Sequence, residues 1–411
     1  GLRNATNIAF AATLGTLLLV LVSALLGGRE RSGFGGFGPL VALVLGVSIL
    51  NAGLLAGLVS VARLLGDPLA IYPVVRFSLP YLMLVPLSVG LLFGIYQLWT
   101  IWRAGQTWAG VRQWYAEHVS SPEAEPEWTV DALAGPGGRR WAAGVARFRR
   151  LAELPRESDR LLVAIGAVGV AILLVVEVRV WLLGAPVWQT AWTHTLSAYL
   201  GVGMPVLLML LLRRGWRSLD SRRRIGMLWD VFTFWPRAYH PLAPPSYAER
   251  AVPELQRRLW RIHDNGGRVV LAAHSQGSVI AAAALLQREE RPPSGDRVAL
   301  VTFGSPLGTL YRWAFPAYFH DQLLRRLVPA AGSGVELVAW RSYYYQTDYV
   351  GREVFADPEV GVDTELPDPP TSWHILDQPA PKPGSHSGYW SDPAVWDEVQ
   401  RLADLQRHTL R

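Results

Sequence analysis

The 411-residue chain contains no cysteine and only one lysine, Lys382. The absence of cysteine excludes disulfide bonds and metal sites built from thiolates. Nearly all of the positive charge is therefore carried by arginine, a bias that we attribute to a GC-rich genome. Charged residues make up 18% of the chain, and they are scarce in a few long apolar runs that raise the mean hydropathy to +0.19. The length allows two or three domains.

Long hydrophobic runs are the most prominent feature of the first half of the chain. A transmembrane helix needs about 20 mainly apolar residues. Five runs are of this length: Ile8–Leu26, Pro39–Ala62, Phe77–Trp102, Leu161–Leu183 and Ala191–Leu212. Buried helices of a soluble protein are the alternative, but five such runs in one chain favour a membrane protein. The sequence therefore predicts an α-helical transmembrane region of about five spans.

Arginine is concentrated in alternate loops, and this asymmetry predicts the orientation of the chain. Arginine-rich segments follow the first, third and fifth runs, whereas the other loops carry few arginines. We therefore expect a multi-pass protein of the cell membrane, with its C-terminal domain cytoplasmic and Gly1 outside. The outside start, and a first residue other than Met, predict that upstream sequence is missing. Because the basic clusters adjoin the apolar runs, the expected partner is the lipid bilayer rather than nucleic acid.

The order of domains follows from these runs. We predict three spans in residues 1–102, a cytoplasmic loop at 103–160, two spans in 161–212, a basic juxtamembrane linker at 213–224 and a C-terminal domain at 225–411. The loop should contain short amphipathic helices, such as Arg139–Leu154. It also carries four tryptophans, which suit either the membrane surface or the surface of the C-terminal domain: Trp108, Trp114, Trp128 and Trp141.

The C-terminal domain alternates between strand and helix patterns. Short apolar runs predict strands at Ile225–Val231, Val269–Ala273, Arg297–Phe303 and Val335–Tyr345. Helices are expected from the capping box at Ser246 to Asn265, at Ser278–Gln287 and after Asp392. Such alternation predicts a small, mostly parallel sheet with helices on both faces. The aromatic-rich stretch Leu307–Leu327 fits either a cap over a site or a helix packed on the sheet.

One short segment joins a predicted strand to a predicted helix through a serine. Val269–Ala273 leads through His274 to Ser275, after which the helix begins. This order is typical of a nucleophile elbow, in which a tight turn lifts the serine hydroxyl above the sheet edge. Ala273 and Gly277 supply the small flanking residues, with Ala273 in place of the first glycine of G-x-S-x-G. We predict Ser275 as a nucleophile; the alternative is a serine in an ordinary strand–helix turn.

A serine nucleophile needs an imidazole to take its proton and a carboxylate to orient the imidazole. With a nucleophile elbow, the acid and then the histidine follow the serine along the chain. Asp348 comes just after the strand Val335–Tyr345, so we predict it as the acid; a turn-stabilising aspartate is the alternative. Four other aspartates lie in a proline-rich stretch with no predicted strand before them: Asp357, Asp363, Asp368 and Asp377.

His386 is the predicted base, because it lies in a glycine-flanked loop, Gly384–Gly388, just before the last helix. A structural loop histidine is the alternative. Other histidines are weaker candidates or come too early in the chain: His374, His320, His408, His263 and His274. His274 adjoins the serine but is expected to point away from it.

An oxyanion hole needs two backbone N–H donors, and the loss of one typically costs about 3 kcal/mol. The first is predicted at Gln276, at the helix N-terminus. The second is predicted in the loop after Val231, at Phe232, Thr233 or Phe234. This chemistry requires no cofactor and no metal.

Residues 225–411 resemble the α/β-hydrolase superfamily, and lipase-like members most closely. The likeness rests on the Ala-His-Ser-Gln-Gly elbow, the strand end Thr302–Pro306, the acid-bearing turn and the spacing of His386 and Tyr389. The apolar half is similar to multi-span membrane proteins of actinobacteria. Together these features suggest a membrane-anchored serine hydrolase acting through an acyl-enzyme on an ester or thioester with an apolar acyl group. Proximity to the membrane favours a lipid or lipid-derived substrate. The alternative is a non-catalytic membrane protein that uses the domain for binding or sensing.

Overall fold

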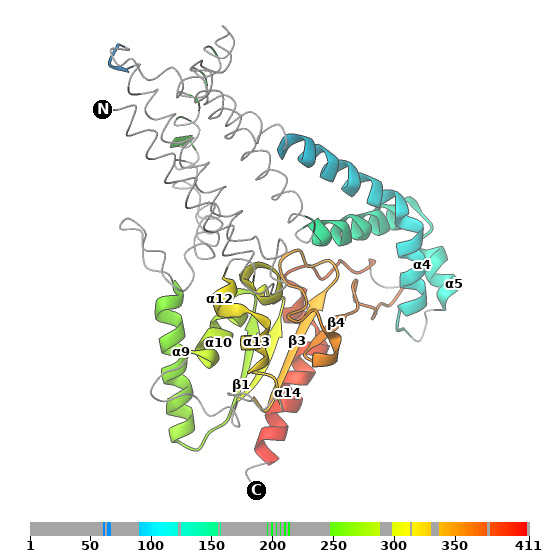
Figure 1. The fold of residues 1–411 in the computed structure, drawn as a ribbon. Coiled ribbons are helices and arrows are strands. Elements are labelled where there is room, and N and C mark those ends of the chain that lie inside the picture. Colours follow the sequence, from blue (N-terminus) through cyan, green and yellow to red (C-terminus); the bar gives the residue numbers. More distant parts are fainter. Residues whose placement is uncertain are drawn as a thin grey trace. The chain divides into compact units, whose positions relative to one another are not determined.

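The structure is a computed structural model of the whole chain (Figure 1). It describes residues 90–121, 125–154, 247–287, 298–312, 315–329, 337–375 and 379–408, with a few single positions between 61 and 213. The chain divides into two units. One comprises residues 1–96 and 158–229, of which few are described; the other comprises 97–157 and 230–411 and contains nearly all the described residues.

The predicted fold class is wrong in its transmembrane part. Among the residues that the structure describes, no helix is long and apolar enough to cross a membrane. The predicted spans lie almost wholly outside the described residues. The described end of the third predicted span is helical at residues 90–104 and gives way to a 3-10 turn at Gly105–Thr107.

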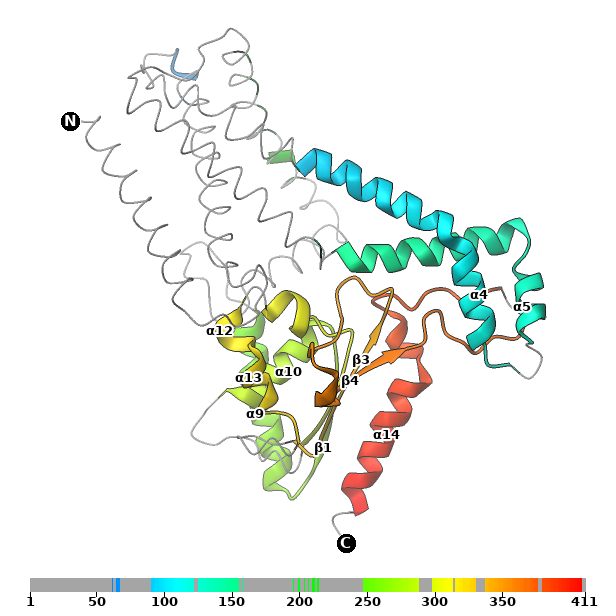
Figure 2. The same ribbon diagram turned by 45° about the vertical axis from the view of Figure 1, so that its right-hand side comes forward.

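The predicted parallel sheet is present, and the structure describes four strands in the order β1-β2-β3-β4 (Figures 1 and 2). The strands are β1 (Val269–His274), β2 (Val298–Phe303), β3 (Ala339–Tyr345) and β4 (Asp363–Leu366), and each pairs in parallel with the next. The first three match predicted strands, although β3 begins later than Val335. The strand predicted at Ile225–Val231 lies outside the described residues.

Strand β4 was not predicted, because its sequence, Asp-Thr-Glu-Leu, has no apolar run. It is the last strand in the described sheet order and is bonded only to β3 within that order. Edge strands are commonly short and polar, since polar side chains discourage pairing with other chains. The proline-rich stretch therefore does contain a strand, and Asp368 follows it closely.

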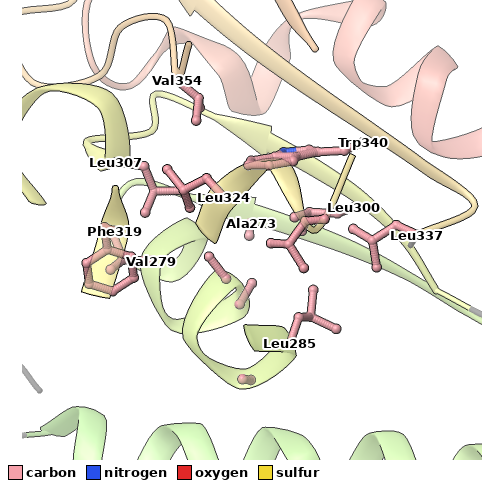
Figure 3. Close-up of a cluster of buried hydrophobic side chains, with 14 of the residues drawn as sticks. Ala273, Val279, Leu285, Leu300, Leu307, Phe319, Leu324, Leu337, Trp340 and Val354 are labelled. Atoms are coloured by element: carbon pink, nitrogen blue, oxygen red, sulfur yellow. The ribbon is translucent and has the colours of Figure 1, made fainter. Parts of the chain in front are cut away.

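Alternating residues of β2 face two different cores. Val298 and Leu300 join the larger core, whereas Ala299, Val301 and Phe303 join the smaller one. The larger core contains Trp340 of β3 and side chains of the helices on that face (Figure 3). Every residue of β2 is buried, which explains its continuous apolar run. Burial on both faces identifies β2 as a central strand of the layered architecture.

In the described part of the chain, three long helices cover the two faces of the sheet. Helices α9 (Tyr247–Asp264) and α10 (Gln276–Leu286) lie on the face of the larger core, and α14 (Pro393–His408) lies on the other (Figures 1 and 2). Gln256 of α9 donates to the carbonyl of Ala284 in α10 at 2.9 Å. Alanines in α10 allow this close approach, because their side chains fill little space between the helices.

Shorter elements connect strand β2 to β3 and β3 to α14. They are a π-helix at Leu307–Tyr311, α12 (Pro316–Phe319), α13 (Asp321–Arg325), and 3-10 helices at Pro358–Val360 and Gly388–Ser391. Tyr311 and Phe319 are buried in the larger core. The aromatic-rich stretch was predicted either to cap a site or to pack on the sheet. For Tyr311 and Phe319 the structure favours packing on the sheet.

Residues 97–157, which we call the helical segment, belong to the same unit as the sheet. The segment contains α4 (Trp108–His118), α5 (Pro126–Ala132) and a helix of residues 136–154. Trp141 Nε1 donates to the carbonyl of Pro381 at 2.7 Å, and Tyr115 Oη donates to that of Pro370 at 3.1 Å. Trp373 packs on Tyr115 from the loop after β4. Trp141 therefore lies on the C-terminal domain, one of the two positions that the sequence left open.

Two glycines meet at the carboxyl edge of the sheet. Gly304 follows β2 with a φ of +56°, and Gly351 lies against it. A Cβ atom on Gly351 would lie 2.0 Å from the carbonyl carbon of Gly304. This contact is backbone to backbone, so neither partner can turn aside as a side chain could. The close approach requires glycine at position 351.

We expect Gly351→Ala to reduce the free energy of unfolding by about 1–3 kcal/mol, because overpacking forces the backbone to shift. Urea denaturation measures this change. The matched control is Gly144→Ala, in the helix of residues 136–154, where a Cβ meets nothing within 4 Å. That variant should be more stable by roughly 0.5–1 kcal/mol, because alanine favours helix. Equal stability of Gly351→Ala and wild type would contradict the close approach.

Candidate active site

Ser275 stands at the turn between β1 and α10. Its φ is +53° and its ψ is −127°, a conformation that is strained for any residue but glycine. Its backbone N–H donates to the carbonyl of Phe303 at 3.1 Å, which ties the turn to the end of β2. Such strain costs about 1–3 kcal/mol and persists only where surrounding contacts hold it. This is the geometry expected of a nucleophile elbow.

A chain of hydrogen bonds holds the backbone of the turn. Ser278 Oγ donates to the carbonyl of Ser275 at 2.6 Å and lies 2.8 Å from Ser305 Oγ. Leu307 N–H donates to Ser305 Oγ at 3.4 Å. Because the carbonyl can only accept, the Ser278 proton points to it, and Ser305 must donate to Ser278. Sequence reasoning missed this chain, since the two serines meet only when β2 and α10 are packed together.

The structure brings the three predicted residues of a triad together. His386 Nε2 lies 2.8 Å from Ser275 Oγ. His386 Nδ1 lies 3.0 Å from each carboxylate oxygen of Asp348. The imidazole therefore bridges hydroxyl and carboxylate through its two different nitrogens. The side chain of His386 is 20% exposed, whereas that of Asp348 is wholly buried.

Asp348 is a buried carboxylate with four donors. Oδ1 accepts from the backbone N–H groups of Val350 at 2.8 Å and Gly351 at 2.9 Å. Burial by itself would raise the pKa of Asp348, but the hydrogen bonds from His386, Gly351 and Val350 outweigh it and lower the pKa below the usual 3.8. The carboxylate is therefore charged at neutral pH and can stabilise a protonated imidazole.

Tyr389 supplies the remaining donor. Its hydroxyl donates to Asp348 Oδ2 at 2.8 Å and accepts from the backbone N–H of Tyr345 at 3.0 Å. The side chain is fully buried, and burial raises the pKa of the phenol far above its usual value, so it remains a donor. The sequence pointed to Tyr389 only through its spacing from His386; its contact with the acid depends on the tertiary fold.

His274 also contributes to the site, through the backbone of His386 rather than through Ser275. Its Nε2 lies 2.8 Å from the backbone carbonyl of His386. A carbonyl oxygen only accepts, so this nitrogen carries a proton. The two imidazole rings lie 4.8 Å apart. Burial lowers the pKa of His274, which favours a neutral ring that supports the histidine loop.

The rival candidates lie elsewhere in the structure. Asp363 accepts from the backbone of Val354 and Phe355, and Asp357 pairs with Arg325. Asp368 is buried between two loops of the site and contacts neither Ser275 nor His386 through its carboxylate. Asp377 is outside the described residues. Of the rival histidines, His320 caps α13, His374 is exposed, and His408 ends α14.

The structure describes only the first of the two predicted oxyanion donors. Gln276 is the first residue of α10, directly after Ser275, so its N–H lies at the positive end of the helix dipole. Phe232, Thr233 and Phe234 lie outside the described residues. Within the described part of the chain, no cluster of three or more possible ligands is placed to hold a metal ion. The arrangement of serine, imidazole and carboxylate can transfer a proton from hydroxyl to imidazole.

We expect Tyr389→Phe to lower the free energy of unfolding by about 1–3 kcal/mol at neutral pH, because buried groups of Asp348 and Tyr345 each lose a partner. The folded-state pKa of Asp348 is depressed, so its ionised form stabilises the fold above pH 3.8, and this contribution is lost as the pH falls through the lower folded value. The effect of the substitution should therefore shrink below pH 3.8.

Chemical denaturation of both proteins at pH 7 and at about pH 3 measures this difference. Tyr349→Phe is the matched control, because Tyr349 is 52% exposed; it should change stability by less than about 0.5 kcal/mol. A stability of Tyr389→Phe equal to that of wild type at neutral pH would show that the phenol does not support the carboxylate.

No protein-family model matches the chain. No curated protein and no solved structure gives a significant match either. The resemblance to the α/β-hydrolase superfamily therefore stays a prediction from the sequence motifs.

Proposed function

We propose that the protein is a serine hydrolase that cleaves esters or thioesters through an acyl-enzyme. The observation that supports it is the continuous hydrogen-bonded chain from Asp348 through His386 to Ser275, with the serine on a strained turn at a helix N-terminus. A structural histidine needs neither the buried carboxylate behind it nor the strained hydroxyl in front of it. Their combination favours nucleophilic catalysis.

Each residue has a defined role in the proposed reaction. Ser275 Oγ attacks the carbonyl carbon while His386 Nε2 takes its proton, and Asp348 stabilises the imidazolium that forms. The backbone N–H of Gln276 donates to the oxyanion. The imidazolium then gives its proton to the leaving alcohol or thiol. Water attacks the resulting acyl-serine with the same histidine as base, which restores the free serine.

Apolar surfaces beside the histidine support a substrate with apolar groups. The ring of Tyr349 lies 6.3 Å from that of His386 and is 52% exposed. Trp390 lies 5.5 Å from His274 and is 56% exposed. Exposed aromatic rings at a site commonly contact apolar ligand groups.

Labelling with a fluorophosphonate probe tests the nucleophile. We expect wild type to be labelled, and Ser275→Ala and His386→Gln to show no labelling above background, because the probe reacts with an activated serine hydroxyl. Ser372→Ala is the matched control, since Ser372 is an exposed serine outside the site, and it should be labelled like wild type. Lack of labelling of folded wild type would overturn the proposal and favour a non-catalytic binding module.

A series of p-nitrophenyl esters with acetyl, butyryl and hexanoyl groups tests the substrate class. We expect kcat/KM to rise from acetyl to butyryl, since each buried methylene contributes up to about 0.8 kcal/mol. The rise should be smaller in Tyr349→Ala. Tyr247→Ala is the matched control, because Tyr247 is a comparably exposed tyrosine at the start of α9. A kcat/KM independent of chain length would contradict an apolar acyl group.

A further inference from the structure

A second buried carboxylate lies behind the site. Asp368 follows β4 and is 2% exposed. Its Oδ2 accepts from the backbone N–H of Thr347 at 2.8 Å and from the Thr347 hydroxyl. Its Oδ1 accepts from the backbone N–H of Gly384 at 2.8 Å. The carboxylate therefore joins two segments that are distant in the sequence.

These two segments carry the acid and the histidine. Thr347 immediately precedes Asp348, and Gly384 and Ser385 immediately precede His386. The hydroxyl oxygen of Thr347 also accepts from the backbone N–H of Ser385 at 3.0 Å. Ser385 has a φ of +45°, which is strained for a residue with a Cβ. The bond from Ser385 to Thr347 thus holds a strained residue in place next to the histidine.

The helical segment holds Asp368 from the other side. Arg149 Nη2 donates to the backbone carbonyl of Asp368 at 2.6 Å. The guanidinium lies 4.5 Å from the ring centroid of Trp114, a cation–π contact within the segment. Trp141 binds the carbonyl of Pro381 on the same loop. The segment therefore contacts both ends of the loop that joins Asp368 to Gly384.

Only a carboxylate satisfies all of these donors. Both oxygens of Asp368 face backbone N–H groups, so an amide in their place would direct its own N–H₂ group at one of these donors. Burial raises the pKa of Asp368, while the hydrogen bonds from Thr347 and Gly384 and the charge of Arg149 oppose that shift. A buried charged group is costly unless it is paired and bonded in this way.

We propose that Asp368 is a positioning residue, whose carboxylate fixes the acid-bearing turn to the histidine-bearing loop and is itself held by Arg149 of the helical segment. This inference rests on the proposed function, since it assigns Asp368 a role in aligning Asp348 with His386. It also gives residues 97–157 a part in the reaction. The segment acts through the loop that it holds.

The variant Thr347→Val tests the proposal with little change in shape. It removes the hydroxyl that bonds Asp368 and accepts from Ser385, but keeps the backbone N–H and the side-chain volume. Thr347→Ser is the matched control, because it retains the hydroxyl. On p-nitrophenyl butyrate we expect kcat of Thr347→Val to fall about 10- to 100-fold with KM nearly unchanged, as misplacement of a catalytic group can cost about 10²-fold. Thr347→Ser should keep most of the wild-type kcat.

Asp368→Asn and Arg149→Ala complete the set. Asp368→Asn should lower kcat at least as much as Thr347→Val, and Arg149→Ala should lower it in the same direction, each with KM nearly unchanged. Urea denaturation establishes that each variant is folded under the assay conditions. If Asp368→Asn does not fold, Thr347→Val and Arg149→Ala still decide the result.

A measurement without substrate separates the positioning role from the proposed function. In protein with histidine-selective ¹⁵N labelling, the proton on His386 Nδ1 should give a downfield signal, because it is bonded to Asp348. We expect this signal to be lost or shifted in Thr347→Val and retained in Thr347→Ser. If the signal changes in this way but wild type neither hydrolyses esters nor reacts with fluorophosphonate, the proposed function fails and the positioning role stands. A wild-type signal and a wild-type kcat in folded Thr347→Val would overturn the positioning role.

Discussion

The buried carboxylate of Asp348 is the group on which the candidate site depends. It has no exposed surface, yet it is charged, because four donors compensate for the loss of water. These donors come from the turn after β3, from the histidine loop and from Tyr389. Each must be in place for the charge to be tolerated, so the same contacts that stabilise the acid also align it with the imidazole.

The surrounding structure is arranged to keep these segments in one geometry. Ser275 is held by β2 and by the serine chain that leads to Leu307, whereas His386 is held by His274 and by the loop that Asp368 fixes. Both Ser275 and Ser385 have positive φ values, so the site carries strain at the serine itself and next to the histidine. Strain of this kind needs rigid support, and the two cores on either side of β2 supply it.

The helical segment packs with the sheet. Residues 103–160 were predicted as a loop whose tryptophans lie on the membrane or on the C-terminal domain, and residues 97–157 belong to the unit that contains the sheet. Aromatic residues of the segment pack against Trp373, and Arg149 reaches the carbonyl of Asp368. Composition alone did not indicate this contact, because tryptophan and arginine are equally compatible with a membrane surface and a protein surface.

The sequence alone indicated the local features: β1, β2 and β3 from apolar runs, α9 from its capping box and periodicity, α10 from its strong helix formers, and Ser275, Asp348 and His386 as candidates from the elements they follow and their order in the chain. It could not determine β4, whose polar residues form a strand only because β3 pairs with them. Nor could it determine the roles of Tyr389, His274, Asp368 and Arg149, since their partners lie far away in the chain. Hydropathy also led to a transmembrane fold class that no described helix supports. Local propensity is encoded in neighbouring residues, whereas hydrogen bonds between distant loops depend on how the sheet brings those loops together.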